Sequence, residues 1–501
     1  MKDAGLKVIG WICAYCIADA WPRFCLTHYM QVPKRLSEIL KRIPALLSPV
    51  ALFCAVWLVQ CAIFPARPAC SSRTQTLSVQ GEGQGGGELR SCLLSRISSQ
   101  DALLVAGPGG NVICSKNEMR RCVPASTLKI LTALAAIDHL GKSYRFRTEF
   151  YQDRDQNLKI KGYGDPMLVS ETWQEISQSL ALSLHGFKDL ILDDTYFVHD
   201  IHIPGVGSST NPYDAPNGAL CANFNTVFLK RDDTGRIVSA EPQTPMTPFV
   251  LKKLRLSSSS SGRHTLCLNG RDAARYAGDL LLYFLKERGQ VFQGEVRAGK
   301  VEPEDSLVYT YHSALTLEQV LKKMFEFSNN FMANQILITL GAHVHGPPGT
   351  LAKGVMVVSD YARDVLHIDD VEIAEGSGIS RNNRMSVLDM LAVLRRFEAY
   401  RGLLVHKGRV FYKSGTLRDI KTRAGYIEGK SGTLYYFVIF LNRSRADIDS
   451  ILDCVKRSLD RGSGNDEDFL QDFSCKHPCG LFDLRVWRQG RAGGTRLRCC
   501  T

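Results

Sequence analysis

Hydrophobic residues recur along this chain in two rhythms, one typical of helices and the other of strands. Over residues 126–140 they recur at helical spacing after a proline, which predicts a buried helix beginning near Ser126. Apolar runs at 101–107 and 111–116 flank a Pro-Gly-Gly turn and predict two paired strands. The first part of the body is therefore expected to form strand, strand and helix in that order.

Three apolar runs, RVFYKSG, KTRAGYI and TLYYFVIFLN, predict further strands near the C-terminus. A Gly-rich turn at 429–432 joins the last two. Helices are expected from Thr316, which has capping-box spacing to Gln319, and over 385–398 and 446–459. This mixture predicts a chain of the α+β or α/β class.

The stretch 145–310 has a different pattern. Alternating apolar and polar residues dominate it together with turn-forming residues, and it contains a run of five serines at 257–261. One helix is expected within it, at 271–288. The pattern predicts a β-rich region between two parts of the chain that share a richer helical content.

The N-terminal part carries a targeting pattern. An uncharged apolar run over residues 43–64 follows Lys34, Arg35, Lys41 and Arg42. This order is typical of a signal peptide, or of an uncleaved single anchor whose basic side stays in the cytoplasm. Its 22 residues are long for a signal peptide and suit one membrane span. Either alternative places the body in a periplasmic or other extracytoplasmic location.

Composition excludes two classes of protein. The 501 residues include 62 Lys plus Arg and 50 Asp plus Glu, and the net charge of +12 is not gathered in a long basic block. A dedicated nucleic-acid binder clusters its charge, so no nucleic-acid partner is expected. Of 16 cysteines, six lie in residues 1–70 and four in 475–500. The body therefore has too few for a disulfide scaffold.

Two short motifs place candidate catalytic groups on helices. Ser126 and Lys129 lie three residues apart, on one helix face, so the lysine amine can reach the hydroxyl. Burial and a neighbouring cation can lower the pKa of such a lysine until it acts as a base. Ser328 and Asn330 follow the helix that starts near residue 316. Ser328 can relay a proton, and Asn330 can hydrogen-bond a substrate amide.

A third motif closes a strand. Lys413 and the hydroxyl of Ser414 can hold a substrate carboxylate at an exposed strand edge, and Gly415 and Thr416 complete the predicted substrate-binding segment. The same letters, KSGTL, occur again at 430–434. The second copy lies between two predicted strands and is interpreted as a hairpin turn. This set of three motifs is typical of serine β-lactamases and penicillin-binding proteins.

The chain resembles the D-alanyl-D-alanine carboxypeptidase/endopeptidase family, the class C low-molecular-mass penicillin-binding proteins, over residues 89–460. The segments that carry the resemblance are PASTLKILTALAAIDHLG at 124–141, GYGDPML at 162–168, FSNNFMANQIL at 327–337, EGSGISRNNR at 375–384 and FYKSGTLRDIKTRAGYI at 411–427.

The resemblance implies a β-lactamase/transpeptidase-like fold, in which helices and a helical subdomain flank an antiparallel sheet. Lys129 and Ser328 lie 199 residues apart, which implies inserted material as in this family. The expected division is as follows: residues 1–88 form a cytoplasmic start, the segment 43–64 and a Gly-rich linker, residues 89–165 and 310–460 form the catalytic domain, residues 166–309 are inserted, and residues 461–501 are a loose basic tail.

The resemblance also implies the reaction. Lys129 takes the proton of Ser126, which attacks the carbonyl before a terminal D-alanine in a peptidoglycan stem peptide, and the same chemistry cuts D,D-crosslinks. The oxyanion is expected between the backbone N–H groups of Ser126 and Thr416, while Ser328 passes a proton to the leaving group. No metal and no organic cofactor are expected. β-Lactams are expected to acylate Ser126.

Three residues depart from the family pattern. Ser414 replaces the usual threonine and keeps the hydroxyl, while Asn329 and Asn334 stand where the family usually has Asp and often has Glu. We expect the two asparagines to alter local hydrogen bonding without removing a catalytic group.

Other polar residues are expected to have structural roles. The pairs His343/His345 and His199/His202 are interpreted as loop residues, Asp165 as ordering its own turn, and Cys122 as a small core residue. Arg381 either lines the cleft or braces a loop.

Two other functions are compatible with the sequence. One is a β-lactamase or esterase on the same fold, and the other is a catalytically silent, membrane-tethered wall-binding protein. The long insertion argues against the first, and the complete set of candidate catalytic residues argues against the second.

Overall fold

The computed structural model describes residues 93, 95–184, 186–255, 261–429, 432–444 and 447–462. All of them belong to the second of two units into which the chain divides, which begins at Gln80. The predicted signal or anchor at 43–64, the Gly-rich linker and nearly all of the tail lie outside the described residues. Within the described part, no helix is long and apolar enough to cross a membrane.

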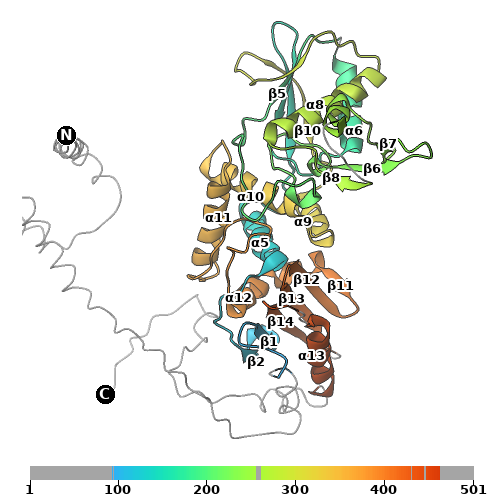
Figure 1. Ribbon diagram of the computed structural model, residues 1–501. Coiled ribbons are helices and arrows are strands. Elements are labelled where there is room, and N and C mark those ends of the chain that lie inside the picture. The colour runs from blue at the N-terminus through green and yellow to red at the C-terminus, as the bar shows by residue number, and fades with distance from the viewer. Residues whose placement is uncertain are drawn as a thin grey trace, which may run out of the picture. The chain divides into compact units, whose positions relative to one another are not determined.

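A six-stranded antiparallel sheet joins segments from both ends of the described chain (Figure 1). Ala102 lies opposite Phe440 in this sheet, and Glu428 opposite Leu434. The predicted strands and the predicted C-terminal hairpin are therefore confirmed. In pairing order the strands are β11 (Val405–Lys407), β12 (Val410–Leu417), β13 (Ile420–Glu428), β14 (Leu434–Leu441), β1 (Ala102–Ala106) and β2 (Val112–Lys116).

Both faces of this sheet are covered. Successive side chains of a strand point to opposite faces, so neighbouring residues of β1 enter different cores. Leu103 and Val105 pack in a core with α13 (Ile448–Gly462). Ala102 and Leu104 belong to a second core shared with five helices. These are α5 (Lys129–Leu140), α9 (Leu317–Glu326), α10 (Asn330–His345), α11 (Leu351–Asp364) and α12 (Val387–Phe397), which form the expected helical layer. The capping box at Thr316 is confirmed.

Residues 147–312, which contain the predicted insertion 166–309, have a core of their own and two sheets. The five-stranded sheet consists, in pairing order, of β10 (Ser306–His312), β3 (Arg147–Gln152), β4 (Leu158–Gly162), β5 (Leu190–Asp193) and β9 (Val296–Ala298). The three-stranded sheet consists of β7 (Ile237–Ser239), β6 (Val227–Arg231) and β8 (Gly262–His264). Helices α6 (Ser170–Ser183), α7 (Pro248–Arg255) and α8 (Gly270–Glu287) accompany them.

The prediction of a single helix in this region is wrong, because α6 and α7 were missed. α6 buries Trp173, Ile176 and Leu180 at helical spacing, but four serines dilute that pattern in its sequence. α7 has only eight residues, too few to show a clear period. The five-stranded sheet begins at residue 147, so it starts before the expected boundary at 166.

Short 3-10 helices connect these elements. They are η1 (Pro108–Gly110), η2 (Ala125–Leu128), η3 (Pro212–Asp214), η4 (Asn223–Asn225) and η5 (Glu398–Leu403). The predicted helix at 126–140 therefore begins as the 3-10 turn η2 and becomes α-helical only at Lys129.

Candidate active site

The segment before Ser126 is held tightly by the sheet. The hydroxyls of Thr127 and Thr422 both donate to the carbonyl of Pro124, each at 2.7 Å. Ala125 adopts a left-handed φ of +48°, a conformation that costs energy for any residue with a Cβ. This fixed, strained turn presents the half-buried Ser126 at the start of η2.

Lys129 is fully buried, and its amine contacts three oxygens. Its Nζ lies 3.0 Å from Ser126 Oγ, 2.7 Å from Asn330 Oδ1 and 2.7 Å from the carbonyl oxygen of Ser377. The amide and carbonyl oxygens can only accept hydrogen bonds. A neutral amine therefore gives its two N–H groups to them and directs its lone pair at the hydroxyl of Ser126.

The surroundings favour that neutral form. Burial lowers the pKa of Lys129 well below its ordinary value, the positive charge of Lys413 lowers it further, and the carboxylate of Glu375 acts in the opposite direction. A lysine base needs this shift, since a protonated amine cannot take the serine proton.

Glu375 organises the loop that supplies the Ser377 carbonyl, and sequence reasoning gave it no role. Its fully buried carboxylate accepts hydrogen bonds from backbone N–H groups, from the Ser377 hydroxyl and from two asparagine amides. The donors are the N–H groups of Ser377 (2.7 Å), Gly378 (2.6 Å) and Ser380 (3.3 Å), Ser377 Oγ (2.6 Å), Asn334 Nδ2 (3.0 Å) and Asn383 Nδ2 (2.8 Å).

Asn334 connects this loop to α10. Its Nδ2 donates to Glu375, and its Oδ1 accepts from the N–H of Gly376 at 2.8 Å. An amide can donate and accept at once, whereas a glutamate there would place a second carboxylate beside Glu375. The expected change in local hydrogen bonding at this family departure is therefore present.

The same loop packs directly on the nucleophile turn. Gly378 has a φ of +83°, and a Cβ built on it would lie 1.9 Å from the carbonyl oxygen of Ala125. No side chain fits at this position, which brings the loop against the turn that carries Ser126.

The strand motif lies on the other side of Ser126. Lys413 and Gly415 are buried, while Ser414 and Thr416 are exposed on the opposite face of β12. A Cβ on Gly415 would lie 2.7 Å from the backbone nitrogen of Ser126. Lys413 Nζ donates to the carbonyl of Ser414 at 2.6 Å, and burial lowers the pKa of Lys413 to about 8.

The Ser-Asn-Asn motif occupies the start of α10. Ser328 has a left-handed φ of +50° and is half-buried. Asn329 is the N-cap and accepts from the N–H of Met332 at 2.9 Å. Asn330 contacts Lys129 directly, whereas the hydroxyl of Ser328 has no hydrogen bond among the described residues. The structure thus joins Ser126, Lys129 and Asn330 by hydrogen bonds.

The remaining polar residues are accounted for outside this cluster. Asp165 Oδ1 accepts from the N–H of Met167 at 2.8 Å, so the residue orders its own turn as expected. Arg381 donates to the carbonyl of Arg418 and so braces a loop. Cys122 is buried, and burial raises the pKa of its thiol to about 11.

The histidines and the repeated motif add nothing to the cluster. Among the described residues no group of His, Cys, Asp and Glu side chains could hold a metal ion. In the second KSGTL copy Lys430 and Ser431 lie outside the described residues, and Gly432 and Thr433 directly precede β14.

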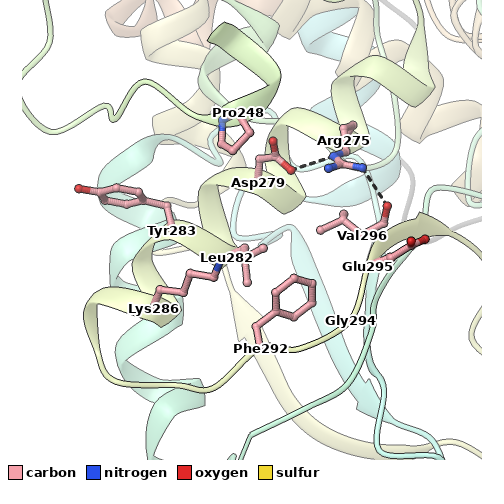
Figure 2. A pocket seen from close by; sticks show the side chains of 10 residues that line it. All are labelled: Pro248, Arg275, Asp279, Leu282, Tyr283, Lys286, Phe292, Gly294, Glu295 and Val296. Atoms are coloured by element: carbon pink, nitrogen blue, oxygen red, sulfur yellow. Dashed lines mark hydrogen bonds and ion pairs between the residues drawn. The ribbon is translucent and has the colours of Figure 1, made fainter. Parts of the chain in front are cut away.

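The inserted region has a cavity of about 440 Å³ (Figure 2). It lies between α8 and the segment leading into β9, and none of its lining residues belongs to the three motifs. Its guanidinium group is already used, since Arg275 contacts Asp279 at 2.8 Å and the carbonyl of Val296 at 2.9 Å. This cavity is separate from the cluster around Ser126.

The family of the chain follows from a match to known sequences. Residues 103–401, more than half of the chain, match the D-Ala-D-Ala carboxypeptidase 3 (S13) family. The chain belongs to this family. It is a serine D-Ala-D-Ala carboxypeptidase that acts on peptidoglycan, and its site of action is therefore extracytoplasmic.

Individual relatives of this S13 peptidase agree. It is 24% identical over 410 residues to a D-alanyl-D-alanine carboxypeptidase of Actinomadura sp. (strain R39), covering 66% of this chain and 75% of the relative. It is 23% identical over 411 residues to the D-alanyl-D-alanine carboxypeptidase DacB of Haemophilus influenzae, covering 68% and 84%.

A solved structure confirms the fold. The chain superimposes on penicillin binding protein 4 of Haemophilus influenzae with a TM-score of 0.60 and 19% identity, covering 76% of this chain and 99% of that one. A second structure of that protein, complexed with a β-lactam, gives a TM-score of 0.56 at 18% identity, covering 74% and 98%. The predicted β-lactamase/transpeptidase-like fold is confirmed.

Proposed function

We propose that Ser126 is the nucleophile of this carboxypeptidase and Lys129 its general base. One observation carries the assignment: a fully buried lysine amine lies 3.0 Å from the serine hydroxyl, and acceptor-only oxygens occupy its other two contacts. Burial lowers the pKa of the lysine, so the amine can take the serine proton.

The acylation step then proceeds as follows. Ser126 Oγ bonds to the carbonyl carbon before the terminal D-alanine and gives its proton to Lys129. The oxyanion forms between the N–H groups of Ser126 and Thr416, where each donor is typically worth about 3 kcal/mol. The close packing of Gly415 against the Ser126 nitrogen supports this placement, because it brings β12 next to the nucleophile.

The remaining motif residues complete the cycle. Ser328 passes the proton to the nitrogen of D-alanine as the C–N bond breaks, and Asn330 orients both Lys129 and the substrate amide. Lys413, on the same face of β12 as Gly415, holds the terminal carboxylate, whereas the predicted help of the Ser414 hydroxyl does not fit its place on the opposite, exposed face of the strand. Water then hydrolyses the ester on Ser126 and restores the free enzyme. None of these steps requires a metal or an organic cofactor.

The proposal extends to substrates and inhibitors. Stem peptides of peptidoglycan that end in D-alanyl-D-alanine are the carboxypeptidase substrates, and D,D-crosslinks are cut by the same steps. β-Lactams acylate Ser126; the complex of the similar Haemophilus influenzae protein with a β-lactam supports this part.

Location and domain organisation belong to the same proposal. Residues 43–64 export the catalytic unit or anchor it as a single span. Cys454 is disulfide-bonded, which supports an oxidising compartment.

The catalytic domain comprises the six-stranded sheet and its helices. The extent of the five-stranded sheet supports an insertion that spans residues 147–312.

Mapping the acylated residue tests the assignment. The protein is incubated with labelled penicillin, and the modified peptide is identified by mass spectrometry. The label is expected on Ser126. Rapid nitrocefin turnover without a lasting acyl-enzyme would favour the β-lactamase alternative, and complete absence of labelling would favour the catalytically silent one.

The repeated motif offers a matched pair of variants. Lys413→Met is expected to lower kcat/KM for a D-alanyl-D-alanine peptide by about 100-fold, since it removes a charged hydrogen bond to the substrate carboxylate. Lys430→Met removes the same charge from the second copy and is expected to leave kcat/KM unchanged. Steady-state kinetics measure kcat/KM of both variants, and an equal loss of kcat/KM in the two would contradict the role of Lys413.

A further inference from the structure

A second pocket, of about 290 Å³, lies beside the segment that leads to the nucleophile. Its lining residues are Gln100, Arg120, Arg121, Cys122, Val123, Arg384 and Asn442. Three arginines therefore contribute to the lining of one small cavity. No carboxylate lines it, and none of these residues belongs to the catalytic cluster around Ser126.

The positive charge of this pocket is only partly neutralised. Arg121 pairs with the carboxylates of Asp370 at 2.9 Å and Glu372 at 2.7 Å. Arg120 and Arg384 form no ion pair with any carboxylate among the described residues, and Arg384 donates only to the carbonyls of its own loop. Two arginines of the lining thus have no ion-pair partner among the described residues, although Asp101, which pairs with Arg443, lies close to Cys122 and Asn442.

A buried donor is also left over. The Nε of Arg121 is buried and has no hydrogen-bond partner among the described residues. This nitrogen is closed off from solvent, so it is not a contact for a ligand in the pocket.

We propose that this pocket binds a phosphate group. Guanidinium groups pair with phosphate oxygens through parallel N–H donors, and three arginines at one cavity suit a doubly charged phosphate better than a singly charged carboxylate. The volume is about ten times that of one liquid water molecule, which is enough for a phosphate and some of its water. Free phosphate and the headgroup of an anionic phospholipid share this chemistry.

The pocket joins the two segments that shape the active site. Cys122 and Met385 form a β-bridge through backbone hydrogen bonds of 2.9 and 3.0 Å. Cys122 lies four residues before Ser126, and Arg384 ends the loop that supplies the Ser377 carbonyl to Lys129. A phosphate held by Arg120 and Arg384 would connect both segments a second time. The thiol itself is not the ligand, since burial raises its pKa to about 11.

The test compares phosphate binding by the full-length chain and by its variants. Isothermal titration calorimetry with sodium phosphate, against sodium chloride at equal ionic strength, is expected to show saturable binding. The double variant Arg120→Gln with Arg384→Gln should weaken that binding by about tenfold or more. Arg236→Gln, which removes an exposed arginine of the insertion, is the matched control and should bind as the parent does.

Three results would overturn the proposal: no phosphate binding beyond the chloride control, equal binding by the double variant, or equally tight binding of acetate. Labelling of Ser126 by penicillin confirms that each variant is folded. If the double variant does not fold, the single variant Arg120→Gln, at an exposed position, replaces it in the binding measurement. Phosphatidylcholine vesicles with and without phosphatidylglycerol separate the sources. A loss of phosphatidylglycerol-dependent vesicle binding in the variant supports the headgroup, and unchanged vesicle binding with lost phosphate binding supports free phosphate.

Discussion

Ser126→Ala is expected to abolish covalent labelling by fluorescent penicillin and to lower kcat for D-alanyl-D-alanine peptides on the order of 10⁶-fold. Removal of the nucleophile leaves no oxygen to form the acyl-enzyme, and such losses are typical when the nucleophile of a serine peptidase is deleted. The fold should persist, because Ser126 is only half-buried and the turn before it is held by the two threonine hydroxyls on Pro124.

A matched control uses another serine. Ser208 is exposed in the inserted region, and Ser208→Ala should label and turn over as the parent does. Gel fluorescence after labelling and a D-alanine release assay measure both properties. If Ser126→Ala retained the label, the nucleophile would lie elsewhere in the chain and the proposed chemistry would be wrong.

Local spacing was enough to predict the central pair of the site. A serine and a lysine three positions apart share one face of any helical turn, so the 3.0 Å contact of Lys129 with Ser126 requires no knowledge of the rest of the fold. The alternation of β12 was not used in this way: Lys413 and Ser414 were expected to hold one carboxylate together, but they lie on opposite faces of the strand. Contacts of this kind depend on the period of a single element.

Contacts between distant segments could not be derived in this way. Ser377, whose carbonyl accepts from Lys129, lies 248 residues along the chain. Glu375 was overlooked because a lone glutamate in a Gly- and Ser-rich segment usually lies in solvent. Only the fold surrounds its carboxylate with N–H groups, as the left-handed Gly378 turns the chain back over Ala125.

The inserted region shows a related limit. Strands β3 and β4 precede the Gly-Asp-Pro turn, so their pattern alone does not say which sheet they join. They pair with β10, which begins at residue 306, and with β5, which begins at residue 190 after helix α6. The sheet therefore begins earlier than the expected boundary, since strand pairing rather than sequence proximity decides membership.

Lys129→Met is expected to lower kcat on the order of 10⁴-fold or more, with little change in KM. Methionine has a similar length but no amine, so the serine proton has no acceptor, while the substrate-binding edge of β12 is untouched. Lys142→Met removes an exposed lysine just beyond the same helix and is the matched control. A Lys129→Met enzyme that kept its kcat would show that another group takes the proton.

The pH dependence of the parent enzyme tests the two lysines together. Lys129 must be neutral, so kcat/KM should rise with pH as this lysine loses its proton, at a pH well below the ordinary lysine range because burial lowers its pKa. Lys413 must be charged to hold the carboxylate, so kcat/KM should fall again as pH passes about 8, the value to which burial lowers its pKa. A peptide with an amidated C-terminus lacks that carboxylate and should lose the alkaline decline but keep the acidic rise. A carboxylate substrate whose kcat/KM climbed steadily to pH 10 would contradict the role of Lys413, since its cation would then be dispensable.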